Sequence, residues 1–252
     1  MDLFLTIALG AALAGFVQGL SGFGFGLTAM AIWAWTMEPK LAAVLALFGG
    51  LSGQVFAAFT VRRGWHFATL LPFILGGIAG LPIGLWLLPK LDVPTFKLVL
   101  GTLLVVVCPL LFFANRLPPI RRGGHLADAL AGSVGGMMGA FGGATGVVPT
   151  LWCTLRGFDR DRQRAVIQNF NLSMLSITFA GYLATGVIEP RMWPWMAIVP
   201  PAALIPGRLG AKLYLGISEL AFRQIVLGLL TLSGIAMLAA SLPVLQARWL
   251  AP

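Results

Sequence analysis

The chain has 252 residues, of which 58% are hydrophobic and only 10% are charged, and its formal net charge is +9. A water-soluble domain carries about 25% charged residues, so this composition excludes an ordinary soluble protein. The basic charges sit in short gaps between apolar runs, which indicates orientation in a membrane rather than binding of nucleic acid. The sequence predicts a single all-α, polytopic membrane domain.

Apolar runs that are long enough, or nearly long enough, to cross a bilayer follow one another along the chain. We expect them at roughly residues 3–20, 24–36, 41–60, 67–88 and 94–114, and then at roughly 126–138, 143–155, 165–185, 192–215 and 222–242. This pattern predicts an N-terminal transmembrane repeat at 1–114, a cytoplasmic linker at 115–124 and a C-terminal transmembrane repeat at 125–252. The apolar N-terminus lacks the basic start of a signal peptide, so we expect it to be retained.

Glycines recur every third or fourth residue at the start of each half. Gly15, Gly19, Gly22 and Gly26 match Gly132, Gly136, Gly139 and Gly143 at a constant offset. Glycine costs about 1 kcal/mol per residue in a helix relative to alanine, so the denser end of each run predicts a helix that breaks inside the protein. Two interpretations stay open: the breaks form an anion site, or the glycines only allow close helix packing.

The basic residues are distributed unequally between the two faces of the membrane. One face receives Arg62, Arg63, Arg116, Arg121, Arg122, Arg156, Arg160, Arg162, Arg164, Arg208, Lys212 and Arg223; the other receives Lys40, Lys90, Lys97, Arg191 and Arg248. Basic residues accumulate on the cytoplasmic face, so both termini are expected to be periplasmic in a bacterial inner membrane. An odd number of crossings per half makes the halves antiparallel, the inverted-repeat plan of many secondary transporters.

The glycine pattern in Ser21-Gly22-Phe23-Gly24-Phe25-Gly26, its second copy ending at Gly142-Gly143, and the late segment Gly207-Arg208-Leu209-Gly210 resemble the sulfite exporter TauE/SafE family. The resemblance covers nearly the whole chain. It implies export of a small sulfur-containing anion such as sulfite, sulfoacetate or a related organosulfonate. Nothing in these residues alone selects sulfite.

An anion in a membrane needs helix N-termini, hydrogen-bond donors or a cation. The expected substrate-binding residues combine the two breaks with polar side chains inside apolar segments: Gln18, Ser21, Gly22, Gly24, Gly26, Gln54, Gly142, Gly143, Thr145, Asn169, Asn171 and Arg208. The polar ones could instead only bond one helix to another. Arg208 follows Pro206-Gly207, a helix-breaking pair, and either reaches the inner surface or attracts the anion in an inner vestibule.

Three further expectations concern function. No carboxylate lies in the middle of an apolar segment, so a carboxylate proton relay is not expected. Transport is expected to be proton-coupled by another route or passive. The sequence has no HExxH or paired-cysteine spacing, so no metal site is expected, and no cofactor is expected. An anion channel of the same fold is the main alternative to alternating access. An intramembrane serine protease at Gly19-Leu20-Ser21-Gly22 is a weaker alternative, because the only histidines, His66 and His125, lie in flanking loops. Oligomeric state is left open.

Overall fold

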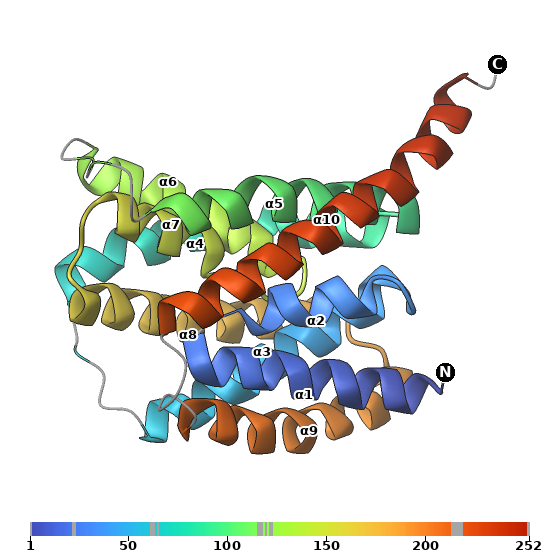
Figure 1. Ribbon diagram of the computed structural model, residues 1–252, viewed down its shortest axis with the longest axis horizontal. Coiled ribbons are helices and arrows are strands. Elements are labelled where there is room, and N and C mark those ends of the chain that lie inside the picture. Colours follow the sequence, from blue (N-terminus) through green and yellow to red (C-terminus); the bar gives the residue numbers. More distant parts are fainter. Residues whose placement is uncertain are drawn as a thin grey trace.

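The computed structural model describes residues 2–21, 24–60, 64, 66–114, 118, 120, 123–212 and 219–250. These residues form α-helices, two short 3-10 turns and no strand. In chain order the elements are α1 (Leu3–Ser21), α2 (Phe25–Trp33), α3 (Pro39–Thr60), α4 (Phe67–Leu87), η1 (Leu88–Lys90), α5 (Val93–Phe113), α6 (Gly124–Gly139), α7 (Val147–Leu155), α8 (Arg160–Ala184), η3 (Pro190–Met192), α9 (Trp193–Lys212) and α10 (Glu219–Leu250) (Figure 1). The all-α prediction is confirmed.

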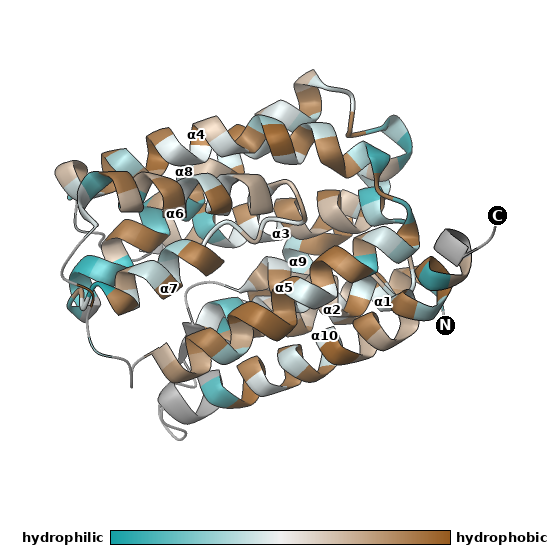
Figure 2. Ribbon diagram, turned by 90° about the horizontal axis from the view of Figure 1, so that it is seen from above, coloured by the Kyte–Doolittle hydropathy of each residue, from teal (hydrophilic) through white to brown (hydrophobic). Residues whose placement is uncertain are grey.

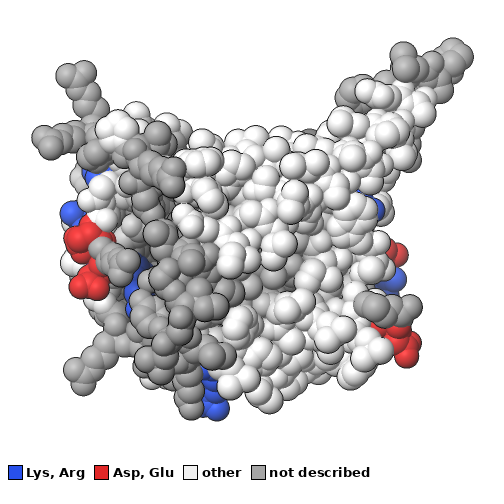
Figure 3. Space-filling model, in the orientation of Figure 1, with Lys and Arg blue, Asp and Glu red and all other residues white. Residues whose placement is uncertain are grey.

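The surface is that of a membrane protein. Five of the described helical stretches are long and apolar enough to cross a bilayer: Leu3–Leu20, Pro39–Phe59, Phe67–Lys90, Val93–Phe113 and Gln224–Ala247. Large apolar side chains such as Leu13, Leu75 and Leu229 are more than half exposed on helix faces. The hydrophobic residues cover the helices while hydrophilic ones gather toward their ends (Figure 2), and charged atoms lie at the two ends of the visible face (Figure 3). The uncharged band between them fits the acyl region of a bilayer.

The first α-helix of each half packs against the fourth α-helix of the other half, α1 against α9 and α6 against α4. A Cβ added at Gly15 or Gly19 of α1 would collide with the backbone of Ala203 or Gly207 in α9. In the same way, glycines of α6 meet the backbone of α4, with Gly136 against Gly77. Glycine at four-residue spacing removes side chains from one helix face and lets two backbones approach closely. The regular spacing in Gly15 and Gly19 therefore serves helix packing, one of the two interpretations that the sequence left open.

The helices α3 and α8 occupy the middle of the bundle. Ala42 to Leu47 of α3 and Ala165 to Asn171 of α8 are continuous buried runs, while α5 and α10 pack on each other, with Gly101 against Gly234. A helix buried on every side belongs to the interior, which explains why α8 carries amides that a lipid-facing helix would not hold.

The helix break predicted at Pro206-Gly207 is wrong. Helix α9 continues from Trp193 to Lys212 with Pro200, Pro201 and Pro206 inside it. Prolines are tolerated in membrane helices when neighbouring groups satisfy the backbone atoms that they free. Gly207 instead provides the close contact with α1.

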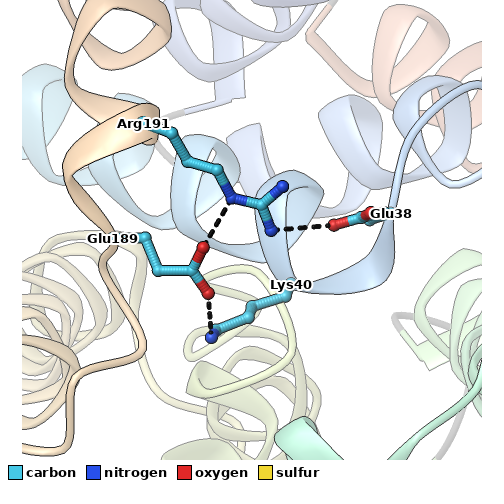
Figure 4. A network of polar contacts seen from close by, with 4 residues as sticks. All are labelled: Glu38, Lys40, Glu189 and Arg191. Carbon is cyan, nitrogen blue, oxygen red and sulfur yellow. Dashed lines mark hydrogen bonds and ion pairs between the residues drawn. The ribbon is translucent and has the colours of Figure 1, made fainter.

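An ion-pair network (Figure 4) lies at the end of the molecule that also holds the start of α1 and the end of α10 (Figure 1). The ammonium of Lys40 lies 2.5 Å from Glu189, and Arg191 contacts both Glu189, at 2.5 Å, and Glu38, at 3.4 Å. These contacts tie the start of α3 to the loop between α8 and α9. The start of α1 and the end of α10 lie at the same end of the molecule, which agrees with the parity that the sequence predicted (Figure 1).

The network makes stability depend on pH in acid. Lys40 and then Arg191 hold the pKa of Glu189 below its ordinary value. The contribution is therefore complete above the ordinary glutamate pKa of about 4.3. It is lost as the pH falls from there through the lowered pKa of the folded protein, because the unfolded chain binds the proton first. We expect Glu189→Gln to lower the melting temperature slightly near neutral pH and to have no effect once the pH lies below the lowered pKa of Glu189 in the folded protein. A difference that persists in acid would contradict this assignment.

At the opposite end the helices are joined by hydrogen bonds in which at most one partner is charged. Arg162 near the start of α8 donates to the hydroxyl of Thr69 at 2.7 Å, and the amide of Asn169 donates to the Gly64 carbonyl at 3.1 Å. These contacts join the start of α8 to the segment before and within the first turn of α4. They mirror the ion-pair network of Lys40, Glu189 and Arg191 in position, since each set joins the first turns of a central helix to the loop before a packing helix.

Candidate functional site

The first hairpin consists of α1 and the short helix α2, which folds back along it. The indole nitrogen of Trp33, at the end of α2, donates to the Thr6 carbonyl at 3.1 Å. A Cβ at Gly10 would collide with the same indole ring. The chain turns through Gly24, whose φ of 94° is a left-handed conformation that favours glycine. The nine residues of α2 thus re-enter rather than cross.

The second hairpin, α6 and α7, has the same construction. The indole of Trp152 near the end of α7 donates to the carboxylate of Asp128 in α6 at 2.7 Å. The turn between the helices contains Gly142 and Gly143, with φ of 93° and 73°. Both predicted breaks are confirmed, and each one requires glycine at its turn.

The two hairpins meet at their turns. A Cβ at Gly26, in the first turn of α2, would collide with the carbonyl oxygen of Gly142 and lie 2.9 Å from the carbonyl carbon of Gly143. A Cβ at Gly142 would lie 2.6 Å from Met30 of α2. The absence of side chains at these positions therefore brings the N-terminal ends of α2 and α7 into one region.

A small cavity of about 20 Å³, partly open to solvent, lies between these two helix starts. Its walls come from both hairpins and from the central helices α3 and α8. The lining residues are Gln18, Gly24, Phe25, Gly26, Leu27, Gly50, Gln54, Gly143, Ala144, Thr145, Gly146, Val147, Asn171 and Leu175. The structure thus brings together seven of the expected site residues: Gln18, Gly24, Gly26, Gln54, Gly143, Thr145 and Asn171.

Backbone N–H groups are concentrated on this wall. The first N–H groups of α2 and α7 have no acceptor within their own helices. Among the described residues, the N–H groups of Ala144, Thr145 and Gly146 make no backbone hydrogen bond, whereas Val147 bonds to Ala144 and Thr150 to Gly146. Free N–H groups beside glycines in a left-handed conformation can hold an anion, and the start of each helix adds about half a positive charge.

The polar side chains of the wall are buried and held in place. The hydroxyl of Thr145 donates to the Asn171 amide oxygen at 2.8 Å, and the two side chains are 1% and 3% exposed. This bond uses the oxygen of Asn171 and leaves its NH₂ group as a donor at the cavity. Gln18 donates to the Gly50 carbonyl at 3.1 Å, which fixes its amide beside the opening. Gln54 is 2% exposed.

The remaining expected site residues are placed elsewhere. Asn169 is buried and bonded to Gly64, away from the lining, and the Arg208 guanidinium lies 4.8 Å from the centre of the Phe56 ring on an exposed part of α9. Gly142 is beside the lining, at the contact with Met30. Gly22 and the Ser21 side chain lie outside the described residues.

The structure also shows Gly50 and Gly146 in the cavity wall and Gly53 beside it, none of which was an expected site residue. Gly50 of α3 supplies the acceptor for Gln18, and a Cβ at Gly53 would collide with the same Gln18 amide. Gly146 lies against the Asn171 amide. Gly50 and Gly53 belong to a glycine cluster in the third apolar segment, which was visible in the sequence. Glycine spacing alone does not show which face of that helix lies against the break.

Tyr182 of α8 supports the second break from behind. Its hydroxyl donates to the Ala140 carbonyl at 2.6 Å, and the side chain is fully buried. Tyr182→Phe leaves this carbonyl without its donor, so we expect a loss of about 1–3 kcal/mol of stability. Thermal unfolding in detergent measures it, with Thr231→Val on α10, where the hydroxyl bonds only within its own helix, as the control. An unchanged melting temperature in Tyr182→Phe would show that the bond does not hold the break.

Two hairpins whose turns meet at a small polar cavity, inside an all-α membrane domain, are an arrangement also found in membrane transporters. The chain belongs to the sulfite exporter TauE/SafE family, whose family model matches residues 7–237. A comparison with curated proteins gave no match. The protein is therefore a multi-pass membrane protein of a transporter family.

Proposed function

We propose that this protein exports a small sulfur-containing anion, sulfite or an organosulfonate, and binds it in the cavity between the two hairpin turns. The family supports the transported class. The observation that carries the location is the convergence of the starts of α2 and α7 on one cavity with the buried Asn171 amide. Backbone N–H groups, a hydroxyl and amides bind oxyanions by hydrogen bonds. These donors carry no net charge, so they do not hold the anion too tightly for release.

Alternating access is the mechanism that the two sets of end contacts support. The Lys40, Glu189 and Arg191 contacts close one end, and the Arg162–Thr69 and Asn169–Gly64 contacts close the other. One end opens when the contacts at that end separate, without a change at the other end. The closely packed pairs α1–α9 and α4–α6 then move as rigid bodies. We place both termini on the periplasmic side, because the predicted basic face is the opposite one.

Counterflow in proteoliposomes tests this function. Vesicles loaded with unlabelled sulfite are expected to accumulate labelled sulfite transiently and with saturation, because a carrier returns loaded more readily than empty. An anion channel of the same fold would dissipate the gradient without counterflow. No sulfite- or sulfonate-dependent flux under any gradient would contradict the proposed cargo.

The serine protease alternative gains no support from the described residues. His125 is largely exposed beside Asp128 at the start of α6, and neither histidine lines the cavity.

A further inference from the structure

We propose that helix α3 bends at Gly50, and that its last part, residues 51–60, is a gate that opens the cavity to the inner end of the molecule. The inner end is the one opposite the start of α1, and α3 ends there (Figure 1). This inference rests on the proposed function, since it identifies the element that moves to let the anion reach the same cavity.

The first support is the size of the cavity. Its volume of about 20 Å³ holds about one water molecule, whereas sulfite and every sulfonate carry three oxygens around the sulfur. A wall must therefore move before the anion binds. The pairs α1–α9 and α4–α6 pack backbone against backbone, so the central helices α3 and α8 are the walls left to move.

Of these two helices, α8 is the stiff one. From Arg160 to Ala180 it contains neither glycine nor proline, and residues 165–171 are buried without interruption. The hydroxyl of Thr145 also holds Asn171 in place at 2.8 Å.

Helix α3 is weak where it passes the cavity. Gly49, Gly50 and Gly53 follow one another closely there, and the hydroxyl of Ser52 donates to the carbonyl of Phe48 at 2.8 Å. Glycine is the poorest helix former after proline, and a hydroxyl bond of this kind often bends a helix. Glycine and serine together are a common cause of sharp kinks.

Gly50 is the glycine of this group that packing does not require. A Cβ at Gly49 would collide with the Phe25 ring, and one at Gly53 with the Gln18 amide. A Cβ at Gly50 would make only ordinary contacts, none closer than 3.7 Å. Glycine at this position therefore weakens the helix without providing a close contact in return, as expected of a hinge.

The part of α3 before Gly50 is firmly held. Residues 42–47 are buried without interruption, and Lys40 pairs with Glu189. The ring of Phe48 packs on Phe179 of α8, with 5.6 Å between the ring centres. This part is therefore fixed to α8 and to the loop that follows it.

The part after Gly50 is held more loosely. Val55 is 41% exposed and Phe59 is 87% exposed, so lipid covers one side of this part and gives way when it swings. The Arg208 guanidinium lies 4.8 Å from the centre of the Phe56 ring. Just beyond α3, the Gly64 carbonyl accepts a hydrogen bond from Asn169. A swing of the gate breaks these contacts at the inner end and leaves those of the outer end intact.

The test follows a fluorine label on the gate of the purified full-length protein. Phe59→Cys is labelled with a trifluoromethyl thiol reagent, while the native Cys108 and Cys153 are buried and stay unlabelled. Without any anion, we expect two fluorine resonances, for the closed and the open gate. Gly50→Ala keeps the carbonyl that accepts from Gln18, and it is expected to lower the open population at least about fivefold at an equal or higher melting temperature.

Two further variants control this experiment. Gly228→Ala makes the same substitution where a Cβ would meet nothing within 4 Å, and it is expected to leave both populations unchanged. Phe56→Ala removes the ring beside Arg208, and it is expected to raise the open population at least about threefold. Should Gly50→Ala not fold, Ser52→Ala takes its place, because it removes the hydroxyl bond to Phe48 and is expected to lower the open population.

Sulfite counterflow connects the hinge to transport. We expect Gly50→Ala to reduce it at least about tenfold relative to Gly228→Ala. A single resonance in the protein with native Gly50, or equal populations with and without Gly50→Ala, would overturn the hinge and leave the proposed function standing. Absence of any sulfite or sulfonate flux in the native protein would overturn the proposed function, whereas the fluorine populations, which need no anion, would still decide the hinge.

Discussion

The Gly26→Ala variant is expected to lose transport, by at least about tenfold, while still inserting into the membrane. A Cβ at this position collides with the Gly142 carbonyl oxygen, and backbone cannot rotate away as a side chain can. The turns of the two hairpins must separate, and overpacking of this kind costs about 1–3 kcal/mol. The N–H groups at the starts of α2 and α7 then no longer face the same cavity. Uptake into proteoliposomes, corrected for the amount of inserted protein, measures the effect.

Gly228→Ala is the matched control for that variant. It makes the same substitution inside α10, where a Cβ would meet nothing within 4 Å. Helix propensity favours alanine there by about 1 kcal/mol, so unchanged flux and equal or higher stability are expected. Wild-type flux from Gly26→Ala would show that contact of the two turns is not needed for transport.

Asn171→Asp is expected to weaken anion binding by at least about 100-fold. The substitution keeps the shape of the side chain and its bond from Thr145, which donates to the same oxygen position at 2.8 Å. It replaces the NH₂ donor at the cavity by a negative charge. Two like charges about 5 Å apart repel by about 3 kcal/mol at an effective dielectric constant of 20. Calorimetric binding of methanesulfonate measures the loss.

Asn169→Ala separates binding from stability. Asn169 is as buried as Asn171 and lies on the same helix, but its amide bonds to the Gly64 carbonyl. We expect this variant to lower the melting temperature and to leave methanesulfonate affinity within about twofold, because its side chain does not line the cavity. If Asn169→Ala and Asn171→Asp lost affinity equally, the site would lie elsewhere on α8.

The sequence predicted the breaks because their physical cause is local. The left-handed turns at Gly24, Gly142 and Gly143 require glycine, and an apolar run interrupted by clustered glycines marks them. It also predicted that Gln18, Thr145 and Asn171 belong to a site, since a polar group inside an apolar segment must have a partner.

The partners of these elements could not be predicted. The glycine face of α1 is free of side chains, yet nothing in it indicates that Gly19 meets Gly207 of α9 rather than the second hairpin. The guanidinium of Arg208 lies over the ring of Phe56, a residue that is distant in sequence. Asn169 and Asn171 were grouped although residues two apart point to different sides of a helix, and the structure accordingly separates them.

The most direct test of the anion site is a crystal structure with selenite, the selenium analogue of sulfite, using anomalous diffraction from selenium. The site predicts one peak between the start of α2 at Gly24 to Gly26 and the segment from Thr145 to Gly146, within hydrogen-bond distance of Asn171. A peak beside Arg208, with an empty cavity at saturating selenite, would contradict the account and move the substrate site to the surface of α9.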